Sequence, residues 1–159
     1  MRARVLLVGC LVVAGCGATS KSGGVGETLS SRTLRVTLEK YVPRVPAARG
    51  HDVTGFDSPG AGNRFVGVRM KVCRTKEDQA INAFAFKLVA GGAHVNPSFP
   101  QSVYSPDFGV SRSGCVDGWI LYAVPRSATA SKLEFRYDDT GGGQYDTREE
   151  HARFSWTLG

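Results

Sequence analysis

The sequence predicts an all-β domain, an antiparallel β-sandwich of six or seven strands, with a β-barrel as the alternative. Three observations lead to this prediction. Apolar residues recur at every second position in several separate runs, which is the period of a half-buried strand. Gly and Pro residues separate these runs, and 20 of the 159 residues are Gly. No window of a dozen residues carries the 3.6-residue period of an amphipathic helix.

The alternating runs place the strands along the chain. We predict strands at 34–39, 66–72, 84–88, 119–124, 133–137 and 154–158, and a further short strand at 103–110. The run at 119–124 is apolar on both parities, so we expect both of its faces to be covered. Turns are expected at Pro43 and Pro46, 55–63, 91–92 and 141–143, and at most one helical turn at 76–80. We expect the following aromatic residues to pack in the core: Phe84, Phe86, Trp119, Phe135, Phe154 and Trp156.

The N-terminus has the features of a secretory signal. Arg2 and Arg4 precede an uncharged run of 11 residues, Val5–Gly15. A membrane-spanning helix needs about 20 apolar residues, so this run is too short to be one. Its length is that of the hydrophobic region of a signal peptide. We therefore expect residues 1–15 to form a signal peptide, and the residues at its end indicate that it is a lipoprotein signal peptide.

The end of this run, Val13-Ala14-Gly15-Cys16, resembles the lipobox of bacterial lipoproteins. The resemblance implies cleavage before Cys16 and attachment of diacylglycerol to its thiol, whereas an ordinary signal peptide is the alternative. Two acyl chains hold a protein stably on a membrane. The expected location is therefore the extracytoplasmic face of the cell membrane, with membrane lipid as a partner through acylated Cys16.

The residues after Cys16 are small and polar. The segment 17–31 reads GATSKSGGVGETLSS and holds almost no large apolar residue. Such a composition is typical of a flexible linker. We therefore expect residues 16–31 to form a lipid-anchored flexible tether and residues 32–159 to form the folded domain.

Two cysteines remain after Cys16, and we expect them to be paired. Cys73 and Cys115 are 115 − 73 = 42 residues apart, and an oxidising compartment favours a disulfide between them. Free thiols or a metal site are the alternatives, although zinc sites usually contain close Cys pairs. Cys73 has the parity of Arg69 and Lys71, which predicts a peripheral bridge rather than a core one.

The strand Asn63–Val72 resembles one in a family of small bacterial lipoprotein domains related to the mycobacterial immunoprotective extracellular antigen. Later segments follow the same outline: 83–86 (AFAF), 114–119 (GCVDGW), 124–125 (VP) and 133–137 (LEFRY). The resemblance covers about residues 33 to 138 and implies an immunoglobulin-like antiparallel β-sandwich of about seven strands. It also implies a surface location and an interaction role. The segment 141–159 has no counterpart in this outline.

Motifs of catalysis or metal binding do not emerge from the sequence. His51, His94 and His151 lie far apart in or beside predicted loops, and no H-x-x-x-H pair occurs. The late carboxylates, Asp138, Asp139, Asp146, Glu149 and Glu150, do not have EF-hand spacing. We therefore expect a protein without catalytic residues, a bound metal or a cofactor.

The net charge of +6 suggests which partners to consider. Residues 17–80 hold 11 basic against six acidic residues, and residues 81–159 hold seven against eight. This excess suits anionic headgroups or wall polymers, or only a soluble surface; nucleic acid is not an expected partner. The function we expect is that of a membrane-anchored extracytoplasmic lipoprotein, a non-enzymatic binding or accessory module for an envelope protein or an anionic wall polymer. A small-ligand or metal carrier and an envelope hydrolase are the alternatives.

Overall fold

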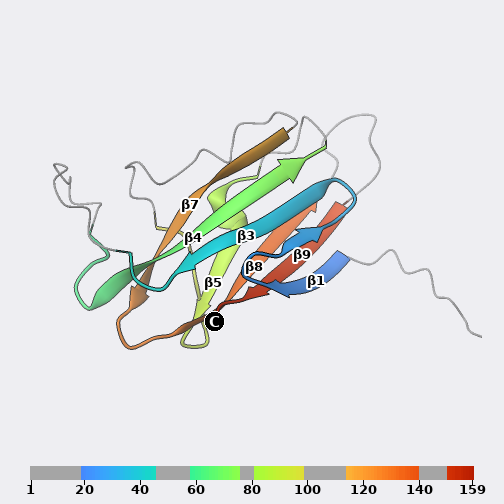
Figure 1. The fold of residues 1–159 in the computed structure, drawn as a ribbon. Helices are drawn as coiled ribbons and strands as arrows, with labels where there is room; N and C mark the ends of the chain where they lie inside the picture. Colours follow the sequence, from blue (N-terminus) through green and yellow to red (C-terminus); the bar gives the residue numbers. More distant parts are fainter. Residues whose placement is uncertain (1–18, 46–57, 76–80, 99–113, 140–149) are drawn as a thin grey trace, which may run out of the picture.

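The computed structural model describes residues 19–45, 58–75, 81–98, 114–139 and 150–159 (Figure 1). They form two sheets that face each other. One holds β1 (Thr19–Gly24), β9 (Glu150–Thr157), β8 (Ala130–Asp139), β5 (Phe86–Ala90) and β6 (Ala93–Val95), in that order. The other holds β2 (Thr28–Ser30), β3 (Leu34–Val42), β4 (Asn63–Arg74) and β7 (Gly114–Pro125). The predicted all-β sandwich is confirmed.

Within the described residues the sandwich has nine strands rather than about seven. The additional strands are β1, β2 and β6, which are short or polar and carry little of the apolar alternation used for prediction. Neighbouring strands are antiparallel, except that β1 runs parallel to β9. The strand predicted at 103–110, the helical turn at 76–80 and the turn at 141–143 lie outside the described residues.

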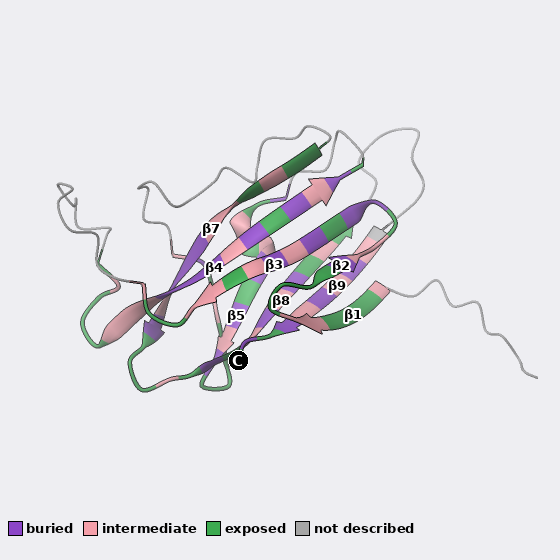
Figure 2. Ribbon diagram, in the orientation of Figure 1, coloured by how far each residue is buried: buried purple, intermediate pink, exposed green. Residues whose placement is uncertain are grey.

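The core lies between the sheets and is built from alternate residues of the long strands (Figure 2). Phe135 lies at its centre, with ring centroids 4.8 Å from Phe86 and 5.7 Å from Phe154. Trp156 meets Phe154 edge-on at 6.2 Å. These four rings confirm the core positions predicted for them. The buried Tyr122 hydroxyl of β7 donates to the Phe86 carbonyl of β5 at 3.3 Å and so connects the two sheets.

Two aromatic residues predicted for the core lie elsewhere. Phe84 is 51% exposed because it belongs to a 3-10 turn, η1 (Ala83–Ala85), and β5 begins only at Phe86. Trp119 is half-buried on the outer face of β7, since the core side of that strand is taken by Ile120, Tyr122 and Val124. Leu121, also on the outer face, is buried where Ser98 bridges to it. The prediction that both faces of β7 are covered is therefore confirmed at Leu121.

The tether predicted over residues 16–31 is wrong for residues 19–30, which belong to the domain. β1 pairs along its whole length with β9, from Thr19 opposite Ala152 to Gly24 opposite Thr157. Leu29 of β2 is buried, and the Trp156 indole N–H donates to the Glu27 carbonyl at 3.1 Å. Backbone pairing with a sheet edge needs no apolar side chains, so a Gly/Ser-rich segment can form an edge strand.

The predicted disulfide between Cys73 and Cys115 is present. The two residues lie directly opposite each other on β4 and β7. Cys73 is half-buried and Cys115 is exposed, so the bridge lies on the outer face of the sheet, as the parity of Cys73 predicted. No helix in the described ranges is long and apolar enough to cross a membrane.

Candidate functional site

On the outer side of the five-stranded sheet, charged side chains of neighbouring strands lie opposite one another. Along β8, Leu133 and Phe135 point into the core, so Lys132, Glu134, Arg136 and Asp138 point outward. The strand register continues this row across the sheet: Glu134 lies opposite Lys87 of β5 and Ser155 of β9. We call this surface the charged face; it also includes His94 of β6, and His151 and Arg153 of β9.

Glu134 is the centre of one cluster on this face. Its carboxylate lies 2.6 Å from the Lys132 Nζ, 3.0 Å from the His94 Nε2 and 3.8 Å from the Arg136 guanidinium. The hydrogen bond from Lys132, followed by that from His94, lowers the pKa of Glu134 against the opposing effect of partial burial. Glu134 is therefore ionised at neutral pH, and its carboxylate is already paired with Lys132 and His94.

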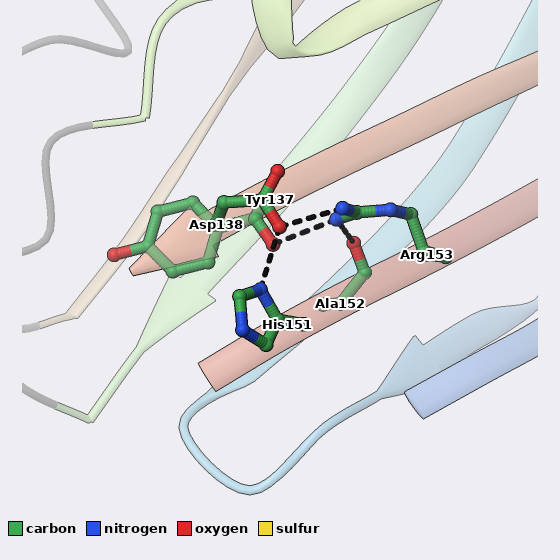
Figure 3. Close-up of polar contacts among 5 residues, drawn as sticks. All are labelled: Tyr137, Asp138, His151, Ala152 and Arg153. Atoms are coloured by element: carbon green, nitrogen blue, oxygen red, sulfur yellow. Dashed lines mark hydrogen bonds and ion pairs between the residues drawn. The ribbon is translucent and has the colours of Figure 1, made fainter. Parts of the chain in front are cut away.

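Asp138 is the centre of the second cluster (Figure 3). Its Oδ1 lies 2.7 Å from the His151 Nδ1 and accepts a hydrogen bond of 2.6 Å from Arg153. Arg153 also donates to the carbonyls of Tyr137 and Ala152, each at 3.1 Å, which fixes its guanidinium above the two strands. The hydrogen bonds from His151 and Arg153 lower the pKa of Asp138.

Between the clusters two arginines face each other. Arg136 and Arg153 are direct cross-strand partners in the antiparallel pair β8–β9, a position where like charges destabilise a sheet. The Arg136 guanidinium has no hydrogen-bond partner among the described residues, and its nearest carboxylate oxygen lies 3.8 Å away. Arg153 is paired with Asp138, so an anion near both arginines would chiefly supply Arg136 with a closer partner. Arg presents donors in a fork that fits carboxylate or phosphate.

An open depression of about 360 Å³ lies over these arginines. Its polar lining comes from three neighbouring strands, with Phe135 and Phe154 beneath: Ser20, Lys132, Glu134, Arg136, Arg153 and Ser155. Ser20 lies opposite Arg153 in the β1–β9 register, so the first strand contributes a hydroxyl group to the site. Cations and hydroxyl groups around one depression can hold an anion; Glu134 is the single carboxylate among the described residues of this lining.

The two described histidines lie in strands and pair with carboxylates, where the sequence suggested loops. Neither lines the depression, and both pairs lie on an open sheet surface. In the described segments, no three His, Cys, Asp or Glu residues gather as metal ligands would. Cys16, His51, Asp146 and Glu149 lie outside the described residues.

Two basic residues of the first half, Arg64 and Arg69, are already engaged within the fold. Arg64 donates to the carbonyls of Pro43, Pro125, Arg126 and Ala128 at 2.7–3.1 Å. Arg69 lies 3.1 Å from Glu39 and 2.6 Å from Asp117, and its pairing with Asp117 raises the pKa of Arg69 further. The sequence missed the arginine pair because it depends on strand register; the alternating charges at 132, 134, 136 and 138 were the only available signal.

Comparisons with known proteins identify solved structures with a similar fold. No family model and no curated protein matches the sequence. The secreted protein MPT63 of Mycobacterium tuberculosis has a similar structure, with a TM-score of 0.55 and 11% identity over 89% of this chain and 99% of that one. A functionally unknown protein of Listeria monocytogenes has a TM-score of 0.51 and 9% identity over 82% of this chain and 80% of its own.

A third similar structure is a candidate lipoprotein of Bacillus subtilis, with a TM-score of 0.48 and 14% identity over 79% of this chain. This chain spans only 37% of that protein. The likenesses to the mycobacterial and Listeria proteins agree with the β-sandwich that the family resemblance implied.

Proposed function

We propose that this protein is a lipid-anchored, extracytoplasmic and non-enzymatic binding module. Acylated Cys16 holds it on the membrane, and the charged face binds an anionic partner, either a wall polymer or an acidic surface of an envelope protein. The proposal is supported by the 13–16 motif, the sandwich fold and the arginine pair. The anchor places the domain where such polymers and proteins occur.

The observation that carries the binding role is the opposition of Arg136 and Arg153. Like charges directly across an antiparallel pair cost stability, and Arg136 has no hydrogen-bond partner in the described part of the chain. Arg153 already pairs with Asp138, whereas Arg136 has only a 3.8 Å ion pair with Glu134, so an anionic ligand would give Arg136 a closer partner. Among the described residues no comparable feature favours the carrier or the hydrolase alternative, since His94 and His151 pair with carboxylates on an open surface.

Binding can be measured directly in solution. The purified protein is titrated calorimetrically with poly(glycerol phosphate) and with polyglutamate at low and moderate salt. We expect saturable binding that weakens with salt, and an affinity about tenfold lower in the double variant Arg136→Gln/Arg153→Gln, since each exposed contact contributes somewhat less than 1 kcal/mol. The matched control Lys40→Gln/Arg44→Gln removes the same charge from two exposed residues, one in β3 of the other sheet and one just after it. An equal loss of affinity in both double variants would show that binding depends on net charge alone and would refute the role of the arginine pair.

The anchor is tested separately. Cys16→Ala should release the protein from the membrane fraction or block its maturation, because the thiol that carries the acyl chains is gone. Unchanged sedimentation of Cys16→Ala with membranes would refute lipidation.

A further inference from the structure

The first strand leaves very little chain between the proposed anchor and the domain. β1 begins at Thr19, which is 19 − 16 = 3 backbone steps from Cys16, with two residues between them. Three steps along a trans backbone span at most about 11 Å. If Cys16 is acylated, as proposed above, the domain is held against the bilayer rather than on a long tether.

The same strand decides which end of the sandwich faces the membrane. Thr19 lies opposite Ala152, so β1 begins beside the start of β9 and the end of β8 (Figure 1). Asp138 and His151 occupy this end, and the exposed Arg32 lies there too, in the turn that leads into β3. The turn that carries the exposed Ser127 lies at the opposite end, between β7 and β8.

The arginine pair lies near the membrane in this orientation. Ser20 is directly opposite Arg153, and four backbone steps from Cys16 to Ser20 span at most about 15 Å. A neighbouring strand adds about 5 Å. The backbone of Arg153 therefore lies within about 20 Å of the acylated residue, and the long side chains of both arginines extend this reach.

We infer that the depression formed by Ser20, Arg136, Arg153 and Ser155 binds the phosphate groups of anionic lipids in the membrane that holds the acyl chains. Phosphate suits the site because guanidinium groups bind it through paired hydrogen bonds, and hydroxyl groups of Ser20 and Ser155 line the same depression. Lipid phosphate is favoured over a wall polymer by reach, since the anchor delivers the headgroups to this end of the sheet. This inference rests on the proposed anchor and binding site, and it assigns membrane lipid to that site in place of a polymer or protein partner.

The experiment places the acylated, full-length mature protein in vesicles of phosphatidylcholine, with or without phosphatidylglycerol, at constant ionic strength. A donor fluorophore is attached through Thr75→Cys, near the end where β1 begins, or through Ser127→Cys at the opposite end; both native residues are exposed. Acceptors are attached to lipid headgroups. We expect more energy transfer from position 75 than from 127, and phosphatidylglycerol should increase the transfer from 75.

The variants identify the residues responsible. Each basic residue near an anionic surface changes binding about fivefold, so Arg136→Gln/Arg153→Gln should lower the docked-to-undocked ratio about 30-fold and abolish the effect of phosphatidylglycerol. Lys40→Gln/Arg44→Gln should keep that effect. Transfer that is independent of phosphatidylglycerol, or a dependence that survives the loss of both arginines, would overturn the inference.

The possible failures can be told apart. Protein that does not sediment with vesicles overturns the anchor and the inference together. If the protein sediments, binds poly(glycerol phosphate) in solution through the two arginines and yet ignores phosphatidylglycerol, the lipid assignment is overturned and the binding module stands. In that outcome the partner is a polymer rather than the membrane.

Discussion

Replacing Arg64 tests whether one side chain joins two loops of the sandwich. Its guanidinium donates to the Pro43 carbonyl after β3 at 3.1 Å, and to the carbonyls of Pro125, Arg126 and Ala128 around the β7–β8 turn at 3.1, 2.7 and 2.8 Å. Four partly exposed hydrogen bonds at about 1 kcal/mol each give about 4 kcal/mol. Releasing the side chain returns about 2 kcal/mol of rotamer entropy. Arg64→Ala should therefore lower the free energy of unfolding by about 2 kcal/mol.

The assay is urea and thermal unfolding with the disulfide intact. A loss of about 2 kcal/mol should move the urea midpoint by about 1 M and the melting temperature by about 8 °C for a domain of this size. Arg64→Lys keeps the charge but lacks the planar fork of the guanidinium group. It should therefore lower the free energy of unfolding about half as much as Arg64→Ala does. Arg44→Ala, at an exposed basic residue nearby, should change stability by less than about 0.5 kcal/mol. A lysine variant as stable as the native protein would refute the role of the fork.

Three further predictions concern packing, the disulfide and acid sensitivity. Gly67→Ala should destabilise the domain by about 1–3 kcal/mol in urea unfolding, because its Cβ would lie 2.9 Å from Val45 Cγ2; Gly24→Ala, whose Cβ would meet nothing within 4 Å, is the control, and equal losses would contradict this account. Replacing both Cys73 and Cys115 by Ser should cost on the order of 4 kcal/mol of unfolding free energy, the chain-entropy value for a 42-residue loop, and an unchanged urea midpoint would refute it. The pKa of Asp138 is lowered in the folded state by His151 and Arg153, so its contribution is present above the unfolded pKa of about 3.9 and is lost as pH falls through the folded value. Asp138→Asn should therefore flatten the decline of stability below about pH 4 in acid titrations of unfolding, and an unaltered decline would contradict this assignment.

The long strands could be predicted because each alternates apolar and polar residues over a half-buried sheet. Val66, Val68, Met70 and Val72 are all buried, as their spacing predicted. Phe84 has the same parity as Phe86 but lies in η1. Alternation cannot show where a strand begins, so the prediction began two residues too early.

The first strands could not be predicted from composition, because β1 is held by backbone pairing and by contacts from distant residues. The indole of Trp156 reaches the Glu27 carbonyl 129 residues earlier in the chain. No sequence pattern within residues 19–30 predicts this contact. The same limit applies to the candidate site. The alternating charges of β8 can be read from the sequence, but that Arg153 and Ser20 lie beside them follows only from the register of the strands.

The net charge of a segment is a poor guide to the candidate site, because charges are neutralised locally by their neighbours in the fold. The basic excess lies in residues 17–80, yet there Arg64 is engaged by four carbonyls, Arg69 lies between two carboxylates and Arg74 is buried. The later segment is nearly neutral, but strand pairing sets Arg136 opposite Arg153, which pairs with Asp138. Among the described residues that line the depression the one carboxylate, Glu134, is already shared with Lys132 and His94. The anion site that we propose therefore lies in a segment whose sequence is electrically balanced.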